Sequence, residues 1–196
     1  MKNKYLSFVI SIMVFMILAA CQTNISQQKF PTMTFQNLSQ IKLMVNNIKV
    51  ISKIKIDLTP PNVAHKLPIT PEKAIIQWAR DCLSIAGNKN TARMIIIDAK
   101  AREISLDLDE GLTGIFKNQQ SHRFEAIIKA RLEIMDDSNN LQAFVTGSAQ
   151  KSITISEATS MSDRQQIWYN LIEKLMNKFN LVMQKNIKQN LQNYLF

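Results

Sequence analysis

Apolar and polar residues alternate along four stretches of the chain, and this period of two predicts four β-strands. The clearest alternation runs from Arg123 to Ile134, where every even-numbered residue is apolar and the odd-numbered ones, apart from Ile127, are charged. A sheet with one apolar and one charged face is typical of antiparallel strands that cover a core on one side only. The four stretches are 41–56, 92–108, 123–137 and 142–155.

Two of these stretches change phase. Alternation within 41–56 is interrupted, so this segment is either one long strand with a bulge or two short strands. The stretch 92–108 changes phase near Asp98 to Arg102. The short polar turn "DDSNN" joins the last two stretches, which predicts a hairpin.

Two further segments carry apolar residues at helical spacing. The first is delimited by Thr70 as N-cap, Pro71 at the first helical position and Gly87 just past its end. The second is longer and begins at a capping box made by Ser162 and Gln165. Its predicted apolar face consists of Trp168, Leu171, Ile172, Leu175, Phe179, Val182 and Met183.

The predicted order of elements is therefore β-α-β-β-β-α. We expect an α+β fold, a two-layer sandwich in which an antiparallel sheet carries both helices on its apolar face. The other face of the sheet would remain charged and in contact with water.

The N-terminus "MKNKYLSFVISIMVFMILAAC" has a different pattern. Lys2 and Lys4 precede an apolar run from Tyr5 to Leu18, which is the layout of an export signal. A retained transmembrane anchor is the alternative, although the run is somewhat short for a helix that needs about 20 apolar residues to cross a bilayer.

The sequence Leu18-Ala19-Ala20-Cys21 resembles the lipobox of bacterial lipoproteins. The resemblance implies that the Cys21 thiol receives diacylglycerol, that the chain is cut before Cys21, and that the new N-terminus is acylated. Two or more acyl chains hold a protein firmly on a membrane, whereas one chain binds reversibly. By the family's sorting rule, Gln22 after the cysteine implies the periplasmic face of the outer membrane.

These features divide the chain into a signal peptide, 1–20, a flexible polar tether, 21–40, and a single α+β domain, 41–196. The alternative for the tether is that Phe30 and Phe35 dock on the domain. Loss of Lys2 and Lys4 with the signal would lower the formal net charge from +9 to +7. Of the two cysteines, only Cys82 would remain free, so we expect no disulfide, no structural zinc and no cofactor. The spacing of the first helix directs Cys82 toward the core.

The order of elements behind the lipobox resembles that of small envelope lipoproteins, including the lipopolysaccharide-assembly lipoprotein and the auxiliary lipoproteins of ABC-type transport systems. The segments "VAHKLPITPEKAIIQWARDCLSIAG" and "RQQIWYNLIEKLMNKFN" also resemble a group of alphaproteobacterial envelope lipoproteins. In that group the patterns H-x-x-P-x-x-P, W-A-x-x-x-L and W-Y recur. This likeness covers most of 41–191, but its motifs are structural and name no chemistry.

A long connection, 109–123, is the first candidate for a binding site. Its apolar residues Leu112, Ile115 and Phe116 belong to no periodic face, and Gly111 and Gly114 give the backbone freedom. We expect these apolar residues to contact a partner protein or a membrane. The alternative is that Phe116 folds back as a lid on the edge of the sheet.

A basic stripe on the last helix is the second candidate. It consists of Lys174, Lys178, Lys185 and Lys188, which fall within about 80° of one another on a helical wheel. The stripe could contact anionic lipid headgroups or an acidic partner, or it could simply be a solvated helix face. An envelope location excludes nucleic acid as the ligand.

Enzymatic motifs are not found in the sequence. His65 and His122 lie near no recognisable nucleophile, and neither G-x-S-x-G nor H-E-x-x-H occurs. The sequence therefore predicts a non-enzymatic outer-membrane lipoprotein that supports envelope assembly or transport through contacts with an envelope protein. The alternative is a tethered periplasmic carrier of lipid or another apolar ligand. Neither the partner nor the oligomeric state follows from the sequence.

Overall fold

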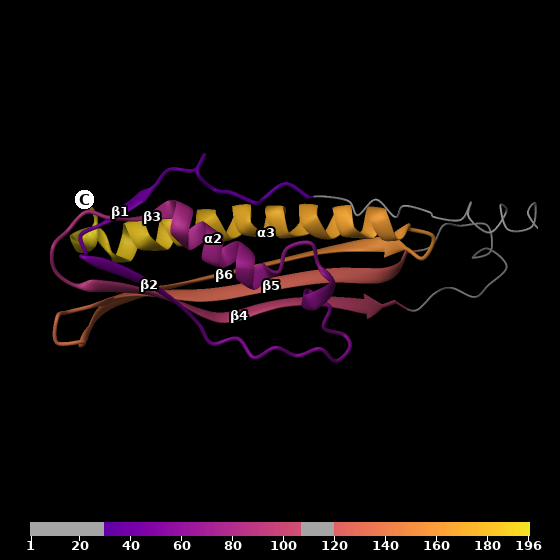
Figure 1. Cartoon of the computed structure of the whole chain (residues 1–196), viewed down its shortest axis with the longest axis horizontal. Helices are drawn as coiled ribbons and strands as arrows, with labels where there is room; N and C mark the ends of the chain where they lie inside the picture. The colour runs from indigo at the N-terminus through magenta and orange to yellow at the C-terminus, as the bar shows by residue number, and fades with distance from the viewer. Residues whose placement is uncertain (1–29, 107–119) are drawn as a thin grey trace, which may run out of the picture.

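The computed structural model describes residues 30–106 and 120–196. Figure 1 shows two layers, with a long helix lying along one face of an elongated sheet. In chain order the elements are β1 (Ile41–Leu43), β2 (Asn47–Ser52), η1 (Ala64–Lys66), α2 (Pro71–Cys82), β3 (Leu83–Ile85), β4 (Thr91–Ser105), β5 (Gln120–Met135), β6 (Leu141–Ser156), α3 (Met161–Asn190) and η2 (Gln192–Tyr194).

The main sheet has the strand order β2-β4-β5-β6. The three long strands pair antiparallel as predicted, but β2 pairs parallel to β4, with Asn47 opposite Thr91 and Ser52 opposite Ile96. The predicted α+β fold class is confirmed. The prediction that the sheet is wholly antiparallel was wrong, because β2 is parallel to its neighbour. The reason is that α2 lies between β2 and β4 in the chain, and a helical crossover returns a strand parallel to the one before it.

The segment 41–56 forms two short strands that belong to different sheets. β1 pairs parallel with β3 in a small two-stranded sheet, and β2 joins the main sheet. The C-terminal residues extend the small sheet, because Leu43 bridges to Leu195. Of the two sequence interpretations, the two-strand version is therefore confirmed, while β3 was not predicted.

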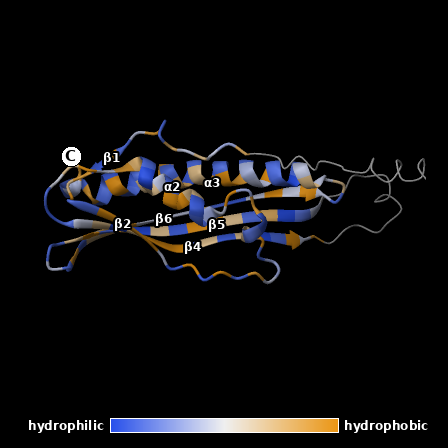
Figure 2. Ribbon diagram, viewed as in Figure 1, coloured by the Kyte–Doolittle hydropathy of each residue, from blue (hydrophilic) through white to orange (hydrophobic). Residues whose placement is uncertain are grey.

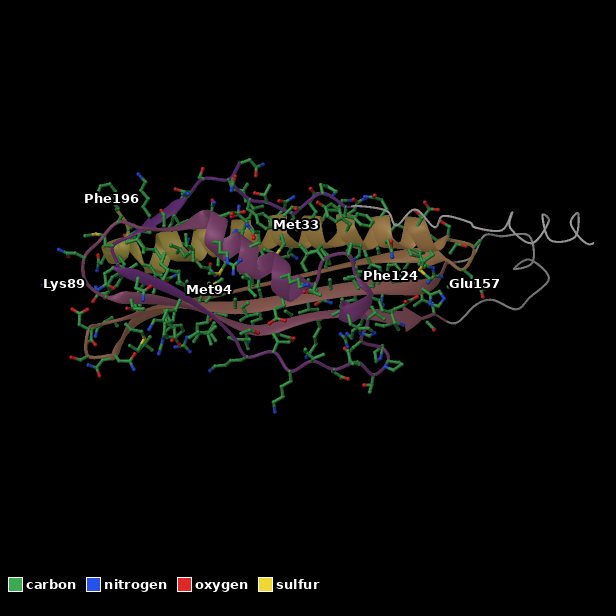
Figure 3. The ribbon with its side chains drawn as sticks, in the orientation of Figure 1. Met33, Lys89, Met94, Phe124, Glu157 and Phe196 are labelled. Atoms are coloured by element: carbon green, nitrogen blue, oxygen red, sulfur yellow. The ribbon has the colours of Figure 1, made fainter. Side chains whose placement is uncertain are left out.

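Both helices pack on one face of the main sheet, as predicted (Figure 2). The face beneath them supplies the even-numbered residues of β5, from Phe124 to Ile134, all of which are fully buried. In Figure 3, Phe124 lies between the sheet and α3, where its ring stacks on Trp168 with a centroid distance of 4.2 Å. The opposite face carries ion pairs between neighbouring strands, such as Arg93 with Glu133 and Arg102 with Glu125.

The helix ends differ in part from the sequence prediction. Thr70 caps α2 as expected, and its hydroxyl accepts from the Lys73 N–H at 3.1 Å. However, α2 ends at Cys82, because residues 83–85 form β3. Gly87 has another role: a Cβ there would lie 2.5 Å from the Met44 carbonyl carbon, so only glycine allows the two backbones to approach.

The start of α3 also differs from the expected capping box. Ser160, rather than Ser162, is the N-cap, and its hydroxyl accepts from the Asp163 N–H at 3.1 Å. Ser160 therefore satisfies one of the N–H groups that the first turn leaves unpaired. Among the residues described, neither helix is long and apolar enough to cross a membrane.

Part of the predicted tether packs on the domain. Met33 and Phe35 are only 5% and 4% exposed and belong to the core, and Met33 is labelled beside α2 and α3 in Figure 3. The Phe35 N–H donates to Asp81 Oδ2 at 2.8 Å, and the ring of Phe30 stacks on Tyr169. The prediction of a flexible tether over 21–40 was thus wrong for this part, because two apolar side chains and a backbone donor find buried partners.

Candidate functional site

A groove of about 870 Å³ lies at the edge of the main sheet, beside the second half of β4. It arises because β2 stops at Ser52, whereas β4 continues to Ser105. In Figure 1 the chain after β2 swings away from β4 and returns at η1, so that it forms a loop beside the strand. We call residues 53–61 of this connection the groove loop.

Backbone hydrogen bonds close the groove at both ends. At one end the Lys53 N–H donates to the Ile96 carbonyl at 3.0 Å. At the other end the Val63 N–H donates to the Ala101 carbonyl and the Glu103 N–H donates to the Pro61 carbonyl, both at 2.9 Å. Between these ends the groove loop does not pair with β4, and the edge of the strand lines the groove.

The direction of the free backbone groups follows from this pairing. Successive residues of a strand point their N–H and C=O groups to alternate sides. Since Ala101 and Glu103 bond toward the groove loop, Ala99 must point the same way. Within the described residues, no hydrogen bond is formed by the N–H or C=O of Ala99 or by the N–H of Ala101 on this side. The groove therefore presents two donors and one acceptor of the backbone.

A small network of hydrogen bonds shapes the groove loop. Asp57 accepts from the Thr59 hydroxyl at 2.6 Å, from the Thr59 N–H at 2.9 Å and from the Asn62 side chain at 2.7 Å. The Thr59 hydroxyl, and then its N–H, hold the pKa of Asp57 below its ordinary value. Asp57 thus remains ionised and fixes the curve of the loop that keeps it away from β4.

Charge in the groove is mostly positive. Three carboxylates line it, against six lysine or arginine side chains and His65. Arg102 is neutralised by Glu125 outside the groove, and Lys100 pairs with Asp98 at 3.3 Å. Within the described part of the chain, four lining lysines have no ion pair: Lys53, Lys55, Lys73 and Lys129.

Apolar side chains are also exposed along the groove. Ile56 and Leu58 in the groove loop are 82% and 62% exposed, and Ile97 in β4 is 41% exposed. Ile97 is exposed because β4 has a bulge between Ile96 and Asp98, which places an extra residue in the strand. The phase change predicted near Asp98 marks this bulge.

Of the residues predicted as sites, only the basic stripe lies within the part of the chain that the structure describes. Cys21 and the three loop residues Leu112, Ile115 and Phe116 lie outside the described residues. The basic stripe lies on α3, where all four lysines are exposed. Leu181, which is 69% exposed, falls at the centre of the stripe by helical spacing. The groove is on another part of the fold and shares no residue with the stripe.

Sequence reasoning missed the groove. The groove loop overlaps the end of the predicted stretch 41–56 and the connection that follows it, and a groove beside such a segment leaves no periodic signal. The available signals were the unpaired apolar residues Ile56 and Leu58 beside lysines, and the phase change in β4. Neither histidine marks a metal site: among the described residues, no group of three or more His, Cys, Asp or Glu could hold an ion.

Comparisons with known proteins add little. No family model matches the chain, and no curated protein matches it. Among solved structures, a minor lipoprotein from Acinetobacter baumannii is similar, with 14% identity over 76% of this chain and 96% of that one. The TM-score of 0.39 is too low for this likeness to support an argument about fold or function.

Proposed function

We propose that this protein is a non-enzymatic lipoprotein, held on the periplasmic face of the outer membrane by acylated Cys21, that supports envelope assembly or transport through contacts with another envelope protein. The lipobox supports the anchor, and the absence of a nucleophile or metalloprotease motif in the sequence supports a role without catalysis.

The close packing of α3 on the sheet favours protein contacts over the alternative function, a carrier that holds a lipid between the helices and the sheet. At Gly147 of β6 an added Cβ would overlap Sδ of Met183 and lie 3.3 Å from the ring of Phe179. Glycine is thus what lets the helix and strand touch. A carrier that held an acyl chain between its layers would need space at this place, whereas here side chains fill it.

A second candidate function uses the groove instead of the interior. The exposed side chains of Ile56, Leu58 and Ile97, together with free lysines, could hold an acyl chain and an anionic headgroup. This is the tethered carrier that the sequence left as an alternative. In the cell, the first function requires a bound partner protein, whereas the second requires a bound lipid or other apolar ligand.

Photocrosslinking in whole cells separates the two functions. A photoreactive amino acid replaces Ile56 in the groove loop, Leu181 in the basic stripe, or Ile153 on β6 as a third exposed position. We expect a discrete protein adduct from one of the first two positions and no stoichiometric lipid in organic extracts of the purified protein. Equimolar bound lipid without any protein adduct would contradict the proposal and favour the carrier.

A further inference from the structure

We infer that the free edge of β4 at Ala99 to Ala101 accepts an extended acidic peptide segment of the partner as an added strand. This inference rests on the proposed function and names the class of partner. It goes beyond that function because it assigns the contact to a backbone edge within the groove, not to the basic stripe.

The first argument is the unpaired backbone. Ala99 and Ala101 offer two N–H groups and one C=O to the groove, and the described residues provide no partner for them. Backbone groups away from bulk water are nearly always paired. Ala99 is 6% exposed and Ala101 is fully buried, so a peptide reaches these groups only when the groove loop moves outward. An extended peptide can bond to these groups in the way that peptides add to exposed sheet edges.

The second argument is length. The two carbonyl groups that close the groove, those of Ile96 and Ala101, lie five residue steps apart along β4. At about 3.3 Å per residue they span roughly 16 Å, which suits four or five residues of an added strand. The network around Asp57 curves the groove loop outward, and this loop would then lie on the far side of the peptide.

The third argument is charge. Lys53, Lys55 and Lys73 are exposed and have no ion pair among the described residues, and Lys129 extends the positive surface onto β5. Asp57 and Glu72 offset part of this charge, but the four lysines without an ion pair outnumber them. An acidic peptide therefore fits better than a basic one. A second copy of this chain would place the same lysines opposite each other, and like charges disfavour that pairing.

The test uses the full-length protein in detergent and a fluorescent peptide that alternates glutamate and valine, with binding followed by anisotropy. A second peptide is N-methylated at alternate residues. This removes the backbone N–H donors along one edge of the peptide and leaves the charge of the peptide unchanged. A third replaces glutamate by lysine. Vesicles containing phosphatidylglycerol replace the peptide in a parallel arm.

The protein variant Lys53→Glu with Lys55→Glu tests the groove. Its matched control is Lys174→Glu with Lys178→Glu, which makes the same change of charge at exposed positions of α3. Because both pairs are exposed, we expect both variants to fold, and thermal melting checks this. Amide hydrogen exchange of Ala99 and Ala101 reports directly on the edge, with Met94 in the paired part of β4 as the internal reference.

We expect the groove variant and the N-methylated peptide each to bind about tenfold more weakly, as the loss of one or two hydrogen bonds or ion pairs implies. The control variant should bind normally. The bound peptide should slow exchange at Ala99 and Ala101 but leave Met94 unchanged. Binding that is insensitive to N-methylation, binding only to vesicles, or unchanged exchange at Ala99 would each overturn the inference.

The crosslinking experiment keeps the two proposals apart. If the groove variant still recovers the partner protein at the wild-type level in cells, the inference fails while the proposed function stands. If the wild-type protein recovers no partner from any labelled position, the proposed function itself fails.

Discussion

The indole N–H of Trp78 in α2 donates a hydrogen bond of 3.0 Å to the side-chain oxygen of Asn180 in α3. Trp78 is fully buried and Asn180 is 6% exposed, so this bond joins the two helices within the core. The rings of Phe179 and Trp78 pack in a T-shaped contact with a centroid distance of 5.2 Å. The contact sets how α2 crosses α3, and α2 with its N-cap supplies the groove residues Thr70, Glu72 and Lys73.

Replacement of Asn180 by alanine should destabilise the protein by about 1–3 kcal/mol, because it leaves the buried indole N–H of Trp78 without a partner. Urea unfolding followed by tryptophan fluorescence measures the change. Asn177→Ala, at an exposed position one turn earlier in α3, is the control and should change the free energy of unfolding by less than about 0.5 kcal/mol. Equal effects of the two variants would contradict the assigned role of the bond.

Gly147→Ala should destabilise the protein by about 1–3 kcal/mol, because the new methyl group needs the space of the buried Met183 side chain. Met183→Ala removes this conflict but leaves a cavity. The double variant should therefore lose less stability than the sum of the two single variants. Strict additivity, measured by chemical denaturation, would show that α3 and β6 do not touch in this way.

Asp81→Ala should release residues 30–38 from the domain. Asp81 accepts from the Phe35 N–H at 2.8 Å, from the Thr34 hydroxyl at 3.2 Å and from Gln77 at 2.9 Å. Hydrogen bonds to a charged group are worth about 1.5–3 kcal/mol each. We expect chymotrypsin to cleave after Phe35 at least tenfold faster in the variant.

Glu157→Ala is the control for this cleavage, since Glu157 is exposed at the turn between β6 and α3 and is labelled well apart from Met33 in Figure 3. An equal acceleration in both variants would indicate general loosening of the fold and not release of residues 30–38.

Cys82 should react with thiol reagents only when the protein unfolds. Burial, and then the negative charge of Asp81, raise the pKa of this thiol to about 12. In a Cys21→Ser background at pH 8, we expect reaction to be negligible in buffer and rapid in guanidinium chloride. Because the unfolded thiol loses its proton near pH 9, stability should fall as the pH rises from about 9 toward 12. Rapid reaction of the native protein would show that Cys82 is accessible.

Cys21→Ser should abolish lipid attachment, since this thiol is the proposed acyl acceptor at the cleavage site. The expected product is an uncleaved precursor or a protein that no longer fractionates with the outer membrane. Metabolic labelling with a fatty acid analogue and membrane fractionation measure the outcome. Normal processing and outer-membrane fractionation of the variant would refute the lipoprotein assignment.

Local periodicity predicted most of the elements because it depends only on which face of a strand or helix is covered. The even-numbered residues of β5 from Phe124 to Ile134 are buried, as alternation implied. The N-cap of α2 at Thr70 likewise needs only neighbouring residues. The bulge after Ile96 had a local signal as well, in the form of the phase change in β4.

Partners far apart in sequence could not be predicted in this way. Pairing of β1 with β3 and of Leu43 with Leu195 joins segments too short for their own pattern to specify a partner. Phe35 lies in a polar stretch that reads as a tether, and only Asp81, 46 residues later, supplies the buried acceptor that fixes it. Such contacts depend on the final arrangement of the layers.

The sequence by itself thus determined the fold class, the faces of the long strands and helices, and the lipobox-like motif at Cys21. The tertiary structure decided the parallel placement of β2, the packing of Met33 and Phe35, and the groove beside Ala99. The physical reason is that the side on which a residue is buried shows in the local order of apolar and polar residues. The unpaired edge of β4 depends instead on how the groove loop, a separate segment of the chain, passes the strand without pairing with it.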